Sequence, residues 1–136
     1  MRAVLDTNVV VSAAMTPHGV CARIIDLLTD DAFGICADDR ILDEYQTVLC
    51  RPELKIVPAD ATEVLNLICS AMEMVPAYPL AVELPDPTDL PFLEVAASAN
   101  ALLVTGNMKH YPKRARAGVT VLTPREFLDM LRPPSS

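Results

Sequence analysis

Short apolar runs alternate along the chain with segments whose apolar residues recur at helical spacing. A continuous apolar run such as residues 102–104 is typical of a strand that is buried on both faces of a parallel sheet. We predict five strands, of which the third is weak. They lie at residues 2–5, 32–37, 73–76, 101–105 and 119–122.

Helical spacing and boundary residues predict the helices between these strands. Asp38 or Asp39 can cap a helix that Pro52 stops, and Thr123 with Pro124 opens the last helix. The predicted helices lie at residues 21–28, 38 or 39 to about 50, 60–72, 86–100 and 124–131. The apolar run at residues 9–15 is given no element, and residues 133–136 are expected to form a frayed tail.

Strands that alternate with helices predict an α/β fold, with a parallel sheet that is covered on both faces. The length of 136 residues fits one domain, residues 1–132, ahead of the tail. Every apolar run is interrupted well before the roughly 18 residues of a membrane span. The chain begins like a buried strand and not like a signal peptide, so we expect a cytoplasmic protein.

Charge and cysteine spacing exclude further classes. The formal net charge is −7, which argues against a general nucleic-acid-coating protein, since such proteins are usually basic. A nuclease remains compatible, because acidic residues at a metal site add negative charge that bound cations offset. The four cysteines are spread without a C-x-x-C pair, so we expect reduced, mostly buried thiols and neither a zinc site nor a redox motif.

Acidic residues stand where a parallel sheet gathers functional groups, at the carboxyl ends of its strands. Asp6 directly follows the first predicted strand, where a buried carboxylate is costly unless a cation or a cap compensates it. Asp86 and Asp89 are three residues apart at a helix start and can face the same way. Ordinary capping is the alternative for all three, through Thr7 and Asn8 in the case of Asp6.

Two more groups fit the same site. Glu44 borders the apolar face of its predicted helix, although it can equally be a solvated charge. Asn107 follows Thr105 and Gly106 after the fourth strand, where it can bind a water or a phosphate oxygen, or simply form a turn. Together these oxygens suit Mg²⁺ or Mn²⁺, which would polarise a phosphodiester and activate water.

Other kinds of site find little support in the sequence. No Ser-His-Asp set and no glycine-rich phosphate loop is apparent, and neither His18 nor His110 has an evident partner. Glu94 is expected on another face of its helix than Asp89. Basic residues gather after the fourth strand and suggest either a rim for an RNA backbone or an ordinary solvated surface; Arg51 is a weaker candidate. The gathered residues are Lys109, His110, Lys113, Arg114 and Arg116.

Four blocks in order resemble the PIN domain, and most closely the PIN-family toxins of bacterial toxin–antitoxin pairs, akin to VapC. The blocks are VLDTNVVVSA, ILDEYQTVL, DPTDLPFLEVAASANALLVTGN and VTVLTPREFL. The resemblance spans nearly the whole chain. It implies a three-layer α/β/α PIN-like fold with a central parallel sheet, and an Mg²⁺- or Mn²⁺-dependent endoribonuclease that cleaves RNA.

The resemblance also implies roles for individual residues. Asp6, Glu44 and Asp89 match the family's catalytic acids, with Asp6, Asp86 and Asp89 as the expected metal ligands. Where the family often has Asp after Thr-Gly, this chain has Asn107, so an amide replaces a carboxylate at an expected catalytic position. The expected substrate-binding residues are Thr7, Asn8, Ser12, Thr105, Lys109, Lys113 and Arg114. A small antitoxin partner and a homodimer are implied as well.

Rival interpretations remain. A haloacid-dehalogenase-type phosphatase needs a second Asp where this chain has Asn8, and a receiver domain needs an Asp after the third strand, which residues 73–76 lack. The stronger rival is a catalytically silent PIN-like module that acts as an RNA- or protein-binding scaffold. Asn107 and the acidic net charge motivate it.

Overall fold

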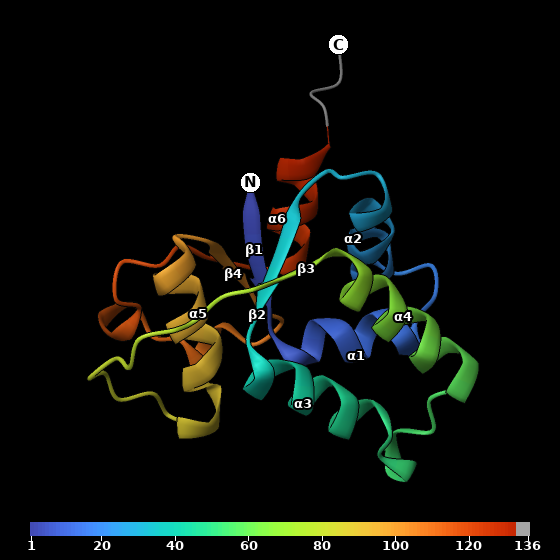
Figure 1. Ribbon diagram of the computed structural model, residues 1–136, viewed down its shortest axis with the longest axis horizontal. Helices are drawn as coiled ribbons and strands as arrows, with labels where there is room; N and C mark the ends of the chain where they lie inside the picture. The colour runs from blue at the N-terminus through green and yellow to red at the C-terminus, as the bar shows by residue number, and fades with distance from the viewer. Residues whose placement is uncertain (133–136) are drawn as a thin grey trace.

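A five-stranded parallel sheet forms the centre of the computed structural model, which describes residues 1–132 (Figure 1). Its strands are β1 (Arg2–Leu5), β2 (Gly34–Ala37), β3 (Met72–Met74), β4 (Leu102–Val104) and β5 (Val121–Leu122). Their order across the sheet is β3-β2-β1-β4-β5, and every pair of neighbours is parallel. The predicted α/β fold is confirmed, and all five predicted strands are present.

The helices begin at the boundary residues that the sequence offers. Asp38 accepts a hydrogen bond from the backbone N–H of Ile41, and Thr123 forms a reciprocal capping box with Glu126. The α-helices are α1 (Thr7–Met15), α2 (Val20–Thr29), α3 (Asp39–Leu49), α4 (Pro58–Ala71), α5 (Leu90–Ala99) and α6 (Pro124–Leu131). Short 3₁₀ turns are η1 (Pro52–Leu54), η2 (Pro87–Asp89), η3 (Met108–His110) and η4 (Lys113–Ala115).

Two segments differ from the prediction. Thr7–Met15 forms α1, to which the sequence pattern had assigned no element, because this helix is buried on several sides and carries the β-branched run Val9–Val11. Its apolar residues therefore show no helical period. The predicted helix 86–100 is divided into η2 and α5, with Pro91 in the first turn of α5. The predicted tail at 133–136 lies outside the described residues.

Helices cover both faces of the sheet, which makes the fold three-layered (Figure 1). On one face α5 packs against β1, β2 and β4, and on the other α1, α2 and α4 pack together while α6 packs on β5 and α2. The core between the layers consists mainly of Val, Leu, Ile and Ala. Two cysteines, Cys21 and Cys36, are buried as expected, whereas Cys50 and Cys69 are exposed.

No helix in residues 1–132 combines the length and the apolar character that crossing a membrane would require.

Tyr45 ties α3 to the carboxyl end of β1. Its side chain is fully buried, its hydroxyl donates to the carbonyl oxygen of Leu5 at 2.5 Å, and its ring lies 6.4 Å from that of Phe92 on α5. One side chain therefore joins α3, the central strand and α5 at the edge of the sheet where Asp6 follows Leu5.

We expect Tyr45→Phe to lower the free energy of unfolding by about 1–2 kcal/mol, because the buried Leu5 carbonyl loses its donor while the ring remains. Urea denaturation followed by circular dichroism measures this change. Tyr78→Phe is the matched control, since Tyr78 is 79% exposed and should be neutral. Equal stabilities of the two variants would contradict the importance of the Tyr45 hydroxyl.

Candidate active site

The topology places the switch point of the sheet between the carboxyl ends of β1 and β4, the place where open α/β sheets form the crevice that binds their ligands. These strands are neighbours at the centre of the sheet, but the chain continues from β1 towards β2 on one side and from β4 towards β5 on the other. Ligands of open α/β sheets bind at such a switch point. The backbone N–H of Asp6 donates to the carbonyl of Val104 at 2.9 Å, so the two strands end side by side.

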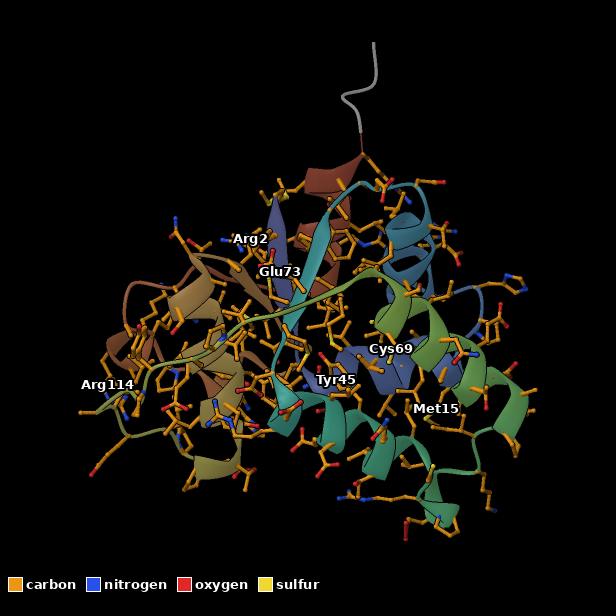
Figure 2. The ribbon with its side chains drawn as sticks, viewed as in Figure 1. Arg2, Met15, Tyr45, Cys69, Glu73 and Arg114 are labelled. Atoms are coloured by element: carbon orange, nitrogen blue, oxygen red, sulfur yellow. The ribbon has the colours of Figure 1, made fainter. Side chains whose placement is uncertain are left out.

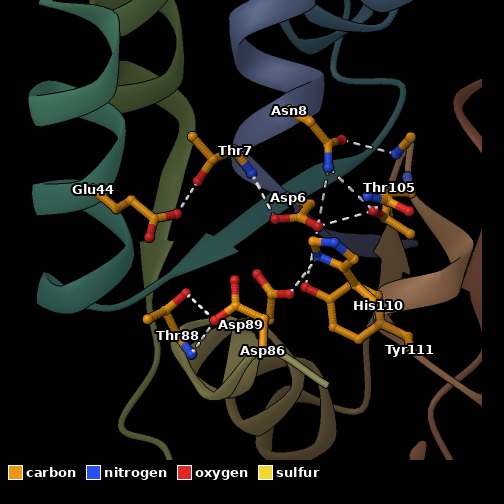
Figure 3. A network of polar contacts seen from close by, with 12 residues as sticks. Asp6, Thr7, Asn8, Glu44, Asp86, Thr88, Asp89, Thr105, His110 and Tyr111 are labelled. Atoms are coloured by element: carbon orange, nitrogen blue, oxygen red, sulfur yellow. Dashed lines mark hydrogen bonds and ion pairs between the residues drawn. The ribbon is translucent and has the colours of Figure 1, made fainter. Parts of the chain in front are cut away.

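Asp6 is the buried centre of this edge, with an exposed fraction of 3% (Figure 3). Its Oδ1 accepts the backbone N–H of Thr7 at 2.9 Å, and this contact also caps α1. Its Oδ2 accepts the hydroxyls of Thr105 at 2.8 Å and Tyr111 at 3.1 Å. Hydrogen bonds from separate elements thus replace the water that burial removes from this carboxylate.

Asn8 fastens the start of α1 to the loop after β4. Its side-chain oxygen accepts the backbone N–H of Gly106 at 2.8 Å, and its side-chain nitrogen lies 3.3 Å from both the Asp6 carboxylate and the Thr105 hydroxyl. A Cβ at Gly106 would lie 3.2 Å from the Asn8 oxygen, so a larger residue there would crowd this contact. The start of α1 and the loop after β4, which border the crevice, are therefore held together.

Glu44 reaches the site from α3. It accepts a hydrogen bond from the hydroxyl of Thr7, the residue after Asp6, and its side chain is half-buried. One turn before Glu44, Arg40 of α3 pairs with the buried Glu94 of α5 at 2.8 Å, and Glu94 also accepts the backbone N–H of Leu80. This pair braces the helix that carries Glu44 against the helix that follows Asp89, and the carboxylate of Glu94 is occupied by Arg40 and Leu80.

Asp89, Asp86 and His110 form a compact group opposite Asp6 (Figure 3). One ligand atom of each lies within 4.8 Å of those of the other two. His110 Nδ1 is 2.7 Å from Asp89 Oδ2, and Asp86 Oδ1 accepts both the backbone N–H and the hydroxyl of Thr88. The chemistry of this group, two carboxylates and an imidazole, is that of a divalent-metal site.

The charges of the carboxylates act on one another. Burial, and then the negative charge of Asp6, raise the pKa of Asp89 from 3.8 to about 6. Burial also raises the pKa of Tyr111, and the charges of Asp6, Asp89 and Glu44 raise it further. Carboxylates from β1, α3 and η2 thus surround one small negative region, which a cation would stabilise.

The structure distributes the predicted site residues unevenly around this region. Asp6, Glu44, Asp86 and Asp89 share one edge of the sheet, but the compact group pairs Asp86 and Asp89 with His110 in place of the expected Asp6. Asn107 is half-buried in the loop after β4, and its backbone N–H donates to the hydroxyl of Thr105.

The other predicted residues lie around the rim or beneath it. Thr105 is fully buried and its hydroxyl supports Asp6, so it has no surface to offer to a substrate. Ser12 lies further along α1 beside the thiol of Cys21. The basic residues Lys109, Lys113 and Arg114 are exposed, and Figure 2 shows Arg114 at the outer edge of the molecule.

Sequence reasoning missed two contributors, His110 and Tyr111. His110 was expected to lack a partner and pairs with Asp89, whereas Tyr111 was not considered as a donor to Asp6. Both follow β4 within a few residues, on and directly after η3, which brings them back over the crevice. The one available signal was their nearness to Asn107 in the chain.

The raised pKa of Asp89 predicts a pH-dependent stability of the metal-free protein. The carboxyl group of Asp89 binds its proton more tightly in the folded state than in the unfolded chain. The stability that this protonation contributes is therefore lost as the pH rises from about 4 to above about 6. Asp89→Asn abolishes that loss. Relative to the parent protein, we expect the variant to gain roughly 1–2 kcal/mol between about pH 4.5 and about pH 7.5, measured by urea denaturation in EDTA.

Asp86→Asn is the control for this measurement. Hydrogen bonds from Thr88 lower the pKa of the half-buried Asp86, so this group is ionised at both pH values. Its substitution should therefore change stability nearly equally at the two pH values, since the charge of Asp86 is the smallest of the causes that raise the pKa of Asp89. A difference between Asp89→Asn and the parent protein that stays constant with pH would contradict the role of Asp89.

Comparison with known proteins identifies the family and the fold of the chain. The chain is similar to the uncharacterized protein MJ1680 of Methanocaldococcus jannaschii, with 26% identity over 95% of this chain and 90% of that protein. Its fold is similar to a chain in the crystal structure of VapBC2 from Rickettsia felis bound to a DNA fragment from their promoter. That match has a TM-score of 0.60 and 21% identity, and it covers 90% of this chain and 98% of that one. Residues 2–109 match the family model of the PIN domain, and the chain therefore belongs to the PIN domain family.

Proposed function

We propose that this protein is a divalent-metal-dependent endoribonuclease that hydrolyses phosphodiester bonds in RNA. The observation that carries the proposal is the convergence of Asp6, Glu44, Asp86 and Asp89 at the switch point of the sheet. Membership of the PIN domain family supports nuclease chemistry. A bound Mg²⁺ or Mn²⁺ ion would polarise the phosphodiester, lower the pKa of a water and stabilise the leaving oxygen.

The residues present fit such an ion. Asp6 and Asp89 are buried close enough that the charge of one raises the pKa of the other, which leaves negative charge for a cation to offset. Oxygen donors are those that Mg²⁺ and Mn²⁺ accept. Asp6, Asp86 and Asp89 would hold the ion, while Glu44 and Asn107 would orient a water or a phosphate oxygen.

The substrate would approach across the rim of the crevice. Thr7 and Asn8 border it at the start of α1, and the exposed Lys109, Lys113 and Arg114 follow β4. Positive side chains on a protein of net charge −7 provide a local track for a phosphate backbone. RNA is proposed as the substrate because the chain resembles the PIN-family ribonucleases. Ser12 lies further along α1 from Asp6, so it would contact only an extended substrate.

We further propose that the protein is the toxin of a toxin–antitoxin pair. The similar fold of one chain in the VapBC2 structure supports a small antitoxin as partner, and the family resemblance adds a homodimer. The second candidate function is a catalytically silent PIN-like module that binds RNA or protein. The amide of Asn107, in place of the carboxylate that the family often has, favours this candidate.

Asp6→Asn should reduce RNA cleavage at least about 100-fold, because the group that anchors the crevice loses its charge. Incubation of the purified protein with a labelled RNA pool and Mn²⁺, followed by gel analysis, measures the loss. Asp43→Asn, the same change on the exposed side of α3, is the control and should cleave normally. Equal cleavage by both variants, with folding confirmed by circular dichroism, would contradict the proposed site.

Metal binding should stabilise the folded protein. At a concentration of about 100 times the dissociation constant, an ion that binds only the folded state adds about 2.7 kcal/mol. We therefore expect the melting temperature to rise on titration with Mn²⁺ and to fall back on addition of EDTA, with the shift reduced in Asp89→Asn. A protein that shows neither stabilisation by metal nor cleavage of any RNA would be the silent module.

A further inference from the structure

His110 has a position that the carboxylates alone do not explain. It lies at the end of η3, in the segment that crosses back over the crevice after β4, and its imidazole faces the same space as Asp86 and Asp89 (Figure 3). The chain therefore adds a nitrogen donor to a site that otherwise offers oxygen.

The spacing of this group fits one ion. Metal–ligand distances of about 2.1 Å place adjacent ligands of an octahedral ion about 3 Å apart and opposite ligands about 4.2 Å apart. His110 Nδ1 is 2.7 Å from Asp89 Oδ2, and all three ligand atoms lie within 4.8 Å of one another. Shifts of a fraction of an ångström would therefore bring the three side chains onto a common ion.

The backbone that carries the imidazole is also held in place before any ion binds. The backbone N–H of His110 donates to the carbonyl of Asn107 at 3.1 Å, and the next residue, Tyr111, is fully buried with its hydroxyl on Asp6. Arg116 donates from Nε to the carbonyl of Tyr111 at 2.8 Å. A ligand on such a fixed segment loses little conformational freedom when it binds a metal.

We propose that His110 is a direct metal ligand beside Asp86 and Asp89, and that it makes the site prefer a divalent transition-metal ion to Mg²⁺. Imidazole nitrogen is a good donor to first-row transition ions, whereas Mg²⁺ keeps oxygen ligands and several waters. This inference rests on the proposed function and deepens it by naming the class of ion. The other role open to His110 is to orient Asp89 by a hydrogen bond alone.

His110→Asn separates these two roles. The carboxamide nitrogen of asparagine can take the place of Nδ1 and still donate to Asp89, but the imidazole is gone. His18→Asn is the matched control, because His18 is the second histidine of the chain and is exposed in the turn between α1 and α2. The probes are Mn²⁺ and Mg²⁺ alone, without RNA, and both affinities are measured by calorimetry.

We expect pulsed electron paramagnetic resonance of the Mn²⁺-loaded protein to show coupling to a ligand nitrogen. His110→Asn should lose this signal and should bind Mn²⁺ about 10-fold more weakly, with affinity for Mg²⁺ nearly unchanged. His18→Asn should retain the parent behaviour in both measurements.

Two outcomes would overturn the inference, and they differ in what they say of the proposed function. If Mn²⁺ binds without nitrogen coupling and His110→Asn retains the parent preference for Mn²⁺ over Mg²⁺, His110 only orients Asp89 and the nuclease proposal is unaffected. If neither ion binds the parent protein, the inference and the metal-dependent nuclease both fail.

Discussion

A carboxylate buried at the end of the central strand is the constraint around which this edge of the molecule is built. Asp6 follows Leu5 directly and is almost without solvent, and an isolated ionised group there would cost several kcal/mol. Its hydrogen bonds come from the first turn of α1, from Thr105 after β4 and from Tyr111 after η3. The elements that form the crevice are therefore the ones that stabilise its charge.

Sequence reasoning could predict the strands and their ends because both rest on local pattern. Short apolar runs predicted β1 and β4. The polar residues Asp6 and Asn107, which follow these strands, indicated the edge of the sheet where functional groups gather. The helix α1 escaped prediction for the opposite reason, since burial on several sides removes the polar face that reveals a helical period.

The partners within the site depend on tertiary geometry, which no local pattern encodes. His110 is 21 positions from Asp89 in the chain, and Tyr111 is 105 positions from Asp6. Thr105 is a further example of what local pattern does not encode. Its position after β4 was predictable from the sequence, but its complete burial was not. Position at a strand end thus identified which residues gather at the crevice, whereas the fold decided which of them face it and which support it.

Structural capping alone explains only part of the acidic edge. The half-buried Asp86 is stabilised by Thr88, and Asp6 by Thr7, Thr105 and Tyr111, so hydrogen bonds account for each of them. Asp89 cannot, since burial and the charge of Asp6 disfavour its ionised form and no side-chain cap depends on it. Two buried acids that lie side by side lower the stability of the folded state. Such a pair is typical of a binding site, where a bound ligand restores that stability. Under the proposed function a divalent cation would restore it here, because one ion would offset both charges at once.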